Sequence, residues 1–107
     1  MHVKENLFAQ IPSALPHEVF DDLVKAPNVR IERIVSKGHT TPDGDWYDQE
    51  QNEWVMVVKG QAKLLFKEGM VEVNLQEGDH INIKAHQHHR VSWTDPTQET
   101  VWLAVFY

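Results

Sequence analysis

The chain has 107 residues, no cysteine and a formal net charge of −6. This length fits a single small domain, and the lack of cysteine excludes disulfide scaffolds, thiolate metal sites and cysteine nucleophiles. An acidic chain without a cluster of Lys or Arg repels phosphate backbones, so we expect no nucleic-acid partner. The start has no apolar stretch of signal-peptide length, and the longest apolar run, residues 101–107, is too short to cross a bilayer. We therefore expect a cytoplasmic protein that does not insert into membranes.

Residues 1–28 are predicted to form an N-terminal segment with a short helix that packs on the rest of the domain. Pro16 suits a first helical position, and Ser13 lies upstream as a possible cap. Four apolar residues then recur at helical spacing: Val19, Phe20, Leu23 and Val24. The helix is expected to end before Pro27.

From residue 29 onward the apolar period changes to two, which is typical of half-buried strands. Strands are predicted at residues 29–36, 54–58, 61–66, 70–75, 80–84, 89–93 and 100–106. Glycine-containing and proline-containing turns separate most of them. Strands this densely spaced, without helices between them, indicate an all-β sandwich or barrel. The one long stretch without periodicity, residues 38–52, is expected to be a loop at the mouth of that barrel.

Two half-motifs stand out within this region. Six residues separate Glu53 from Gly60, and His89 follows Gly78 at a matching distance for a second motif. Together they resemble the two signature motifs of the cupin superfamily, G-x5-H-x-H-x3/4-E-x6-G and G-x5-P-x-G-x2-H-x3-N. The resemblance implies a double-stranded β-helix, or jelly-roll barrel, over residues 29–107. In that family the glutamate and three histidines hold a divalent metal inside the barrel.

The chain departs from this pattern at several positions. One allowed spacing places Tyr47 and Gln49 where the family has its histidine pair, and the other places Trp46 and Asp48 there. Of the family ligands, the chain keeps Glu53 and His89. The second motif also differs, because Lys84, His86 and Trp93 replace its proline, glycine and asparagine.

Strand parity predicts which of these side chains meet. Alternation places Tyr47, Gln49, Glu53, Val55 and Val57 on one face, and His89, Val91 and Trp93 on another. In a cupin-like barrel both faces point inward, so Glu53 and His89 are expected to converge. A buried carboxylate needs a partner. Two interpretations stay open: a Glu53–His89 pair that only specifies the core, or a pair that binds a metal or a ligand.

A metal site built from these donors would be weak. Imidazole and carboxylate suit Zn, Ni, Fe or Mn, whereas the Gln49 amide is a weak ligand and the Tyr47 phenol must ionise to bind well. The candidate ligands are therefore Gln49, Glu53 and His89, with Tyr47 as a fourth. We expect low occupancy, and a metal-free pocket is the alternative.

Other candidates surround this set. The histidines His86 and His88, with His80 nearby, form a rival cluster, but by the motif alignment only His89 points inward, and the first two are interpreted as exposed loop residues. His39, in the long loop, has no assigned role. Trp46 and Trp93 flank the inferred site and are expected to line its pocket.

The first functional hypothesis is a metal-dependent enzyme of oxygenase, isomerase or lyase type that acts on a small oxygen-bearing molecule. Glu53 and His89 would be its metal ligands or its catalytic acid/base pair. The alternative is a non-catalytic module that binds or senses a small ligand, with weak or no metal; a third possibility is a structural protein. We also expect a homodimer, with Leu7, Phe8 and Ile11 packed on the barrel or on the partner.

Overall fold

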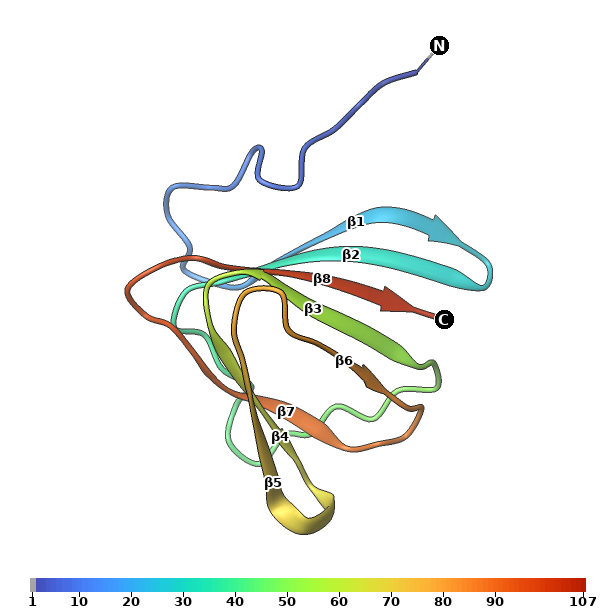
Figure 1. Cartoon of the computed structure of the whole chain (residues 1–107), viewed down its shortest axis with the longest axis vertical. Coiled ribbons are helices and arrows are strands. Elements are labelled where there is room, and N and C mark those ends of the chain that lie inside the picture. Colours follow the sequence, from blue (N-terminus) through green and yellow to red (C-terminus); the bar gives the residue numbers. More distant parts are fainter. Residues whose placement is uncertain (1) are drawn as a thin grey trace.

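The computed structural model describes residues 2–107, which fold into two facing antiparallel sheets (Figure 1). The strands are β1 (Val19–Ala26), β2 (Val29–Ser36), β3 (Glu53–Lys59), β4 (Ala62–Phe66), β5 (Val71–Leu75), β6 (His80–Ile83), β7 (His89–Thr94) and β8 (Thr100–Phe106). A single 3₁₀ turn, Glu68–Met70, joins β4 to β5. The predicted all-β class is confirmed, and the strands predicted from residue 29 onward match the observed ones closely.

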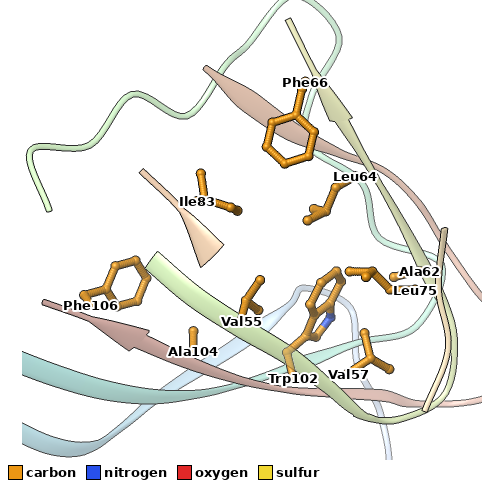
Figure 2. Packing of buried hydrophobic residues seen from close by; sticks show 10 residues of the cluster. All are labelled: Val55, Val57, Ala62, Leu64, Phe66, Leu75, Ile83, Trp102, Ala104 and Phe106. Carbon is orange, nitrogen blue, oxygen red and sulfur yellow. The ribbon is translucent and has the colours of Figure 1, made fainter. Parts of the chain in front are cut away.

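The larger sheet has the strand order β1-β2-β8-β3-β6, and the smaller has the order β5-β4-β7. Their inner faces enclose the core, in which Val55, Leu64, Ile83 and Trp102 point toward one another (Figure 2). In the part of the chain that the structure describes, no helix is long and apolar enough to cross a membrane.

The inner face follows directly from alternation along the strands. On β3, Glu53, Val55 and Val57 are buried, whereas the residues between them are partly exposed. On β4 the same rule buries every second residue, beginning with Ala62. Because side chains of a strand alternate between its faces, this pattern places Glu53 among the core residues.

The predicted helix over residues 16–25 is wrong, because most of this stretch is strand β1. β1 pairs antiparallel with β2 through a two-residue turn, and the ladder shifts register between Asp22 and Val24. This bulge interrupts the alternation of period two, which leaves the apolar residues at helix-like spacing. Pairing with β2 also places Asp21 opposite Arg33, with which it forms an ion pair of 2.6 Å. Tertiary pairing therefore overrides the local helical pattern.

Arg33 also holds the N-terminal segment against the outer face of the larger sheet. Its guanidinium donates to the backbone carbonyls of Leu7 and Ala9 at 3.0 and 2.6 Å, and only 7% of the residue is exposed. Of the three residues expected to pack here, Leu7 and Ile11 are partly buried, whereas Phe8 is 50% exposed. The segment is thus tied down by backbone hydrogen bonds to one buried cation.

The glycine of the first motif is required by its backbone and its surroundings. Gly60 has a φ of 90°, in the left-handed region that other residues rarely adopt. A Cβ at this position would lie 2.5 Å from Oγ1 and 2.8 Å from Cα of Thr100, the first residue of β8. Gly78, in the second motif, has a similar φ of 89°, but a Cβ there would meet open space.

We predict that Gly60→Ala destabilises the fold more than Gly78→Ala does. Both changes place alanine in the left-handed region, which costs about 1–2 kcal/mol, and only the first also forces a clash, which adds about 1–3 kcal/mol. Urea unfolding of the two variants measures the difference. Equal losses of unfolding free energy would contradict the close approach of Gly60 to β8.

Candidate functional site

A pocket opens between the inner face of the larger sheet and β7. Its volume is about 70 Å³, enough for a few water-sized groups. Apolar residues of β2, β3, β4, β6, β7 and β8 form most of its wall. The polar lining residues are Glu18, Tyr47, Gln49, Glu53 and His89. The pocket is therefore small and mostly apolar, with a few polar groups, which is the usual character of a small-molecule site.

Glu53 and His89 meet across the two sheets. Glu53 begins β3 and His89 begins β7, and their exposed fractions are 8% and 4%. Nε2 of His89 lies 3.3 Å from Oε1 of Glu53. Nε2 of Gln49 donates to the same carboxylate oxygen at 3.0 Å. The convergence predicted from strand parity is therefore present.

The proton on the other nitrogen of His89 is fixed by the backbone. Nδ1 lies 2.9 Å from the carbonyl oxygen of Gln87, which can only accept, so Nδ1 carries a proton. Nε2 then faces Glu53 either as a second donor or as an acceptor from a protonated carboxyl. Burial lowers the pKa of His89, but the hydrogen bonds with Glu53 and Gln87 and the charge of Glu53 outweigh it, and the pKa is raised. The pair therefore favours an imidazolium next to a carboxylate.

Tyr47 joins this pair through its backbone. Its N–H donates to the carbonyl of His89 at 2.8 Å, and the N–H of His89 returns a bond of 3.2 Å. The two rings lie 5.5 Å apart. Burial raises the pKa of the Tyr47 phenol, and the nearby charge of Glu18 raises it further. The phenol therefore stays protonated at neutral pH.

The structure thus brings Tyr47, Gln49, Glu53 and His89 to one pocket. The two tryptophans expected beside them lie elsewhere and do not line it. A register shift in the pairing of β4 with β7 places Trp93 opposite Lys63, on the outer face, and turns Thr94 inward instead. Parity fails at Trp93 because of this bulge.

Trp46 also lies away from the pocket, in contact with cations. The amino group of Lys67 is 5.8 Å from the centre of its ring, and the guanidinium of Arg90 is 6.0 Å from it.

The rival histidines form a separate surface group with Asp48. Nδ1 of His86 lies 2.8 Å from one carboxylate oxygen of Asp48, and Nε2 of His88 lies 3.5 Å from the other. The hydrogen bond with His86, together with both imidazoles, lowers the pKa of Asp48. His80 packs against Trp54 on the outer side. Within residues 2–107, no three His, Cys, Asp or Glu side chains come together in a way that could hold a metal ion.

Glu18 is the site residue that sequence reasoning missed. It lies just before β1 and lines the pocket, and its carboxylate is 2.5 Å from Oγ of Ser36. The sequence assigned this position to a helix, so nothing connected Glu18 with the barrel interior. Recognising β1 as a strand paired with β2 would have placed it there.

The comparisons with known proteins agree with this architecture. The family profile described as "Cupin domain" matches residues 33–106. The chain belongs to the cupin family. A search of curated proteins finds no significant match. The match of the family profile confirms the predicted membership of the cupin superfamily, and with it the double-stranded β-helix.

Three solved structures illustrate the likeness. A Ralstonia eutropha protein with a provisional assignment as mannose-6-phosphate isomerase is 43% identical, with a TM-score of 0.93 over 98% of this chain and 97% of that one. A cupin superfamily protein from Desulfitobacterium hafniense has a TM-score of 0.74 and 14% identity over 90% and 82% of the two chains. The Fe(II) form of HppE has a TM-score of 0.73 and 17% identity over 92% and 54%. The last two share the fold alone.

The family pattern implies a divalent metal between Glu53 and His89, and the donor set can be tested against that group. His89 offers Nε2, because its Nδ1 is engaged by the backbone, which is how metal-binding imidazoles are usually oriented. Gln49 can turn its amide oxygen inward by rotation about its last bond. The protonated phenol of Tyr47 is a poor donor. With two strong ligands and two weak ones, the residues present fit a weak divalent site.

We predict that Glu53→Gln lowers the pKa of His89 from above its unfolded value to below it. Without the carboxylate, the burial of the imidazole dominates. NMR titration of the imidazole measures this pKa, and Asp48→Asn serves as a control that removes a carboxylate beside His86 and His88 only.

The same shift predicts how stability depends on pH. Because the folded pKa of His89 is raised, its contribution to the unfolding free energy is complete below the unfolded pKa of about 6.5 and is lost as pH rises through the folded pKa. The Glu53→Gln variant should lack this loss. If the contribution of His89 to the unfolding free energy of the wild-type protein grew with rising pH, the raised folded pKa would be contradicted.

Proposed function

We propose that this cupin domain binds a small oxygen-bearing molecule in its barrel pocket, with Glu53 and His89 as the pair that contacts it. One observation carries the proposal: the pair is buried, yet it lines a cavity instead of being enclosed by side chains. A pair that only specified the core would leave no such space beside it.

The pair supports proton transfer. One nitrogen of His89 is held by the carbonyl of Gln87, so a proton on the other nitrogen can be shared with Glu53 or passed to a ligand oxygen. An imidazole and a carboxylate within hydrogen-bonding reach are the usual groups for general acid–base catalysis. This chemistry supports an isomerase or lyase type of reaction.

A divalent metal is part of this proposal. Gln49, Glu53 and His89 would hold it, with Tyr47 as the fourth residue, and the donor types suit Zn, Ni, Fe or Mn. When bound, the metal supplies a Lewis acid that polarises an oxygen of the ligand. The Fe(II) form of HppE shows that this fold can carry such an ion.

A second candidate is a non-catalytic module that binds or senses a small ligand. The observation that favours it is the direct contact of Glu53 with both His89 and Gln49, which satisfies the carboxylate without any metal.

The Ralstonia relative's provisional assignment suggests isomerisation of a sugar phosphate. The lining of this pocket, however, contains no Lys or Arg, the residues that usually recognise phosphate.

Metal titration separates the two candidates. We predict that the double change Tyr47→His with Gln49→His raises the affinity for Zn²⁺ or Ni²⁺ at least about tenfold, because each imidazole replaces a weaker donor in the same pocket. His89→Ala should abolish the weak binding of the natural chain. Isothermal titration calorimetry on untagged protein measures both effects.

His86→Ala and His88→Ala are the matched controls, since they remove imidazoles that contact Asp48 outside the pocket. They should leave metal binding unchanged. Unaltered affinity in the double-histidine variant, or loss of binding from His86→Ala alone, would place the metal on the surface group and favour the non-catalytic module.

We also propose that the protein is a homodimer, formed through the outer face of the larger sheet. Trp54 and Met56 of β3 lie in register with Val105 and Leu103 of β8. Their buried neighbours along each strand face inward, so these four partly exposed side chains form a continuous outer apolar patch. Patches of this kind mark interaction surfaces.

Light scattering should give the mass of a dimer, and Met56→Glu should convert it to a monomer because a carboxylate would be buried in the interface. Met70→Glu is the control: it makes the same change at a 61% exposed site on the β4–β5 connection. A monomeric wild-type protein at tens of micromolar, or equal effects of the two changes, would remove the proposal.

A further inference from the structure

The carboxylate of Glu18 is held in place by a chain of hydrogen bonds from the core. The indole Nε1 of Trp102 lies 3.2 Å from Oγ of Ser36, and that oxygen lies 2.5 Å from Oε2 of Glu18. An indole N–H can only donate, so Ser36 accepts from Trp102 and its own hydroxyl proton is available for Glu18. Ser36 is fully buried and Trp102 nearly so. The position of Glu18 is thus specified by rigid parts of the barrel.

Glu18 and Glu53 belong to opposite ends of the larger sheet. Ser36 pairs with Thr100, the first residue of β8, whereas Glu53 pairs with Phe106, the last residue of the same strand. Both glutamates nevertheless line one pocket. The wall between its polar ends includes Ile34, Val91 and Trp102, which are apolar apart from the engaged indole N–H. The pocket therefore has a carboxylate at each end and a mainly apolar wall between them, with Tyr47 near enough for the charges of both glutamates to raise its pKa.

Acidic groups outnumber basic groups in this lining. It includes two carboxylates and a single basic group, His89, which is already paired with Glu53. Two arginines next to lining residues have partners of their own: Arg30 lies over the ring of Phe106 and beside Asp22 and Glu32, and Arg90 donates to the carbonyl of Thr41. No basic group in the lining offsets the negative charge of Glu18. An anionic group at that end would meet a carboxylate in a partly desolvated pocket, where like charges repel strongly.

We propose that Glu18 is a specificity-determining residue that accepts a hydrogen bond from the end of the ligand remote from Glu53. The ligand then carries a hydroxyl or an ammonium group at that end, and phosphate esters and carboxylates are rejected there. Ser36 occupies one of the two carboxylate oxygens, and a carboxylate has about four acceptor sites, so acceptors remain for a ligand. This inference rests on the proposed function, because it concerns the same pocket.

A matched series of four-carbon probes tests the charge preference: 1,4-butanediol, 4-amino-1-butanol and succinate, which carries a carboxylate at both ends. The indole N–H of Trp102 is a direct reporter, since it donates into the Ser36–Glu18 chain and is one of four tryptophan signals in a ¹⁵N-correlated NMR spectrum. The neutral and cationic probes should shift this signal on titration. The anionic probe should bind at least about tenfold more weakly, which corresponds to about 1.4 kcal/mol.

Glu18→Gln keeps the size and one acceptor oxygen of the side chain but removes its charge. It should erase the preference between the cationic and anionic probes, whereas Glu68→Gln, the same change at an exposed residue of the 3₁₀ turn, should leave it intact. An anionic probe that binds as well as the others, a preference that survives Glu18→Gln, or no shift of the Trp102 signal with any probe would each overturn the inference.

The failure of this inference and that of the proposed function are distinguishable. Zn²⁺ titration followed at the imidazole signals of His89 reports on the Glu53 end alone. A metal response at His89 without any charge preference at Trp102 would remove the role of Glu18 and leave the proposed function standing. Loss of both responses would remove both.

Discussion

The contact between Glu53 and His89 is the constraint on which the rest of the site depends. Glu53 starts a strand of the larger sheet and His89 starts a strand of the smaller one, so their 3.3 Å contact connects the two layers inside the barrel. Burying either group alone would cost several kcal/mol. Together they offset this cost because their opposite charges attract and the two groups share a proton. Gln49 and the carbonyl of Gln87 complete their hydrogen bonds.

The long loop before β3 adopts its path because of the same strand, β7. The backbones of Tyr47 and His89 bond each other in both directions, and Thr41 exchanges bonds with Val91 through its N–H and its hydroxyl. Further along, the hydroxyl of Thr94 donates to the carbonyl of His39 at 2.6 Å. The loop therefore runs along β7 and closes part of the barrel, which is why Tyr47 and Gln49 reach the pocket although they precede β3.

Sequence patterns predicted the site where strands are regular and failed where they are not. From residue 29 onward, alternation located the strands and placed Glu53 and His89 on facing inner surfaces, because a period of two leaves no freedom in an unbroken ladder. Two of the errors lie beside a bulge. A shift in β7 turned Trp93 outward, and a shift in β1 produced the helix-like spacing that concealed Glu18.

No local signal reveals such bulges, since they are fixed by the partner strand. The extra residue of β7 is accommodated between Lys63 and Leu64 of β4, and that of β1 between partners on β2. Loop contacts are equally invisible in the sequence, because Thr41 and Val91 are far apart along the chain. Pairing between strands that are distant in sequence causes the wrong predictions at the two bulges, and hydrogen bonds to β7 set the position of the long loop.

The raised pKa of His89 has a consequence for whatever occupies this pocket. The positive charge next to Glu53 is that of the protonated imidazole, and its stabilisation by Glu53 and the carbonyl of Gln87 is what raises the pKa of His89. A metal ion needs the same Nε2 lone pair, so binding must first release that proton. A neutral ligand oxygen faces no such competition and can accept the proton instead. The same electrostatic pairing that makes the buried pair stable would therefore weaken the proposed metal binding at low pH and favour ligands that accept a hydrogen bond from His89.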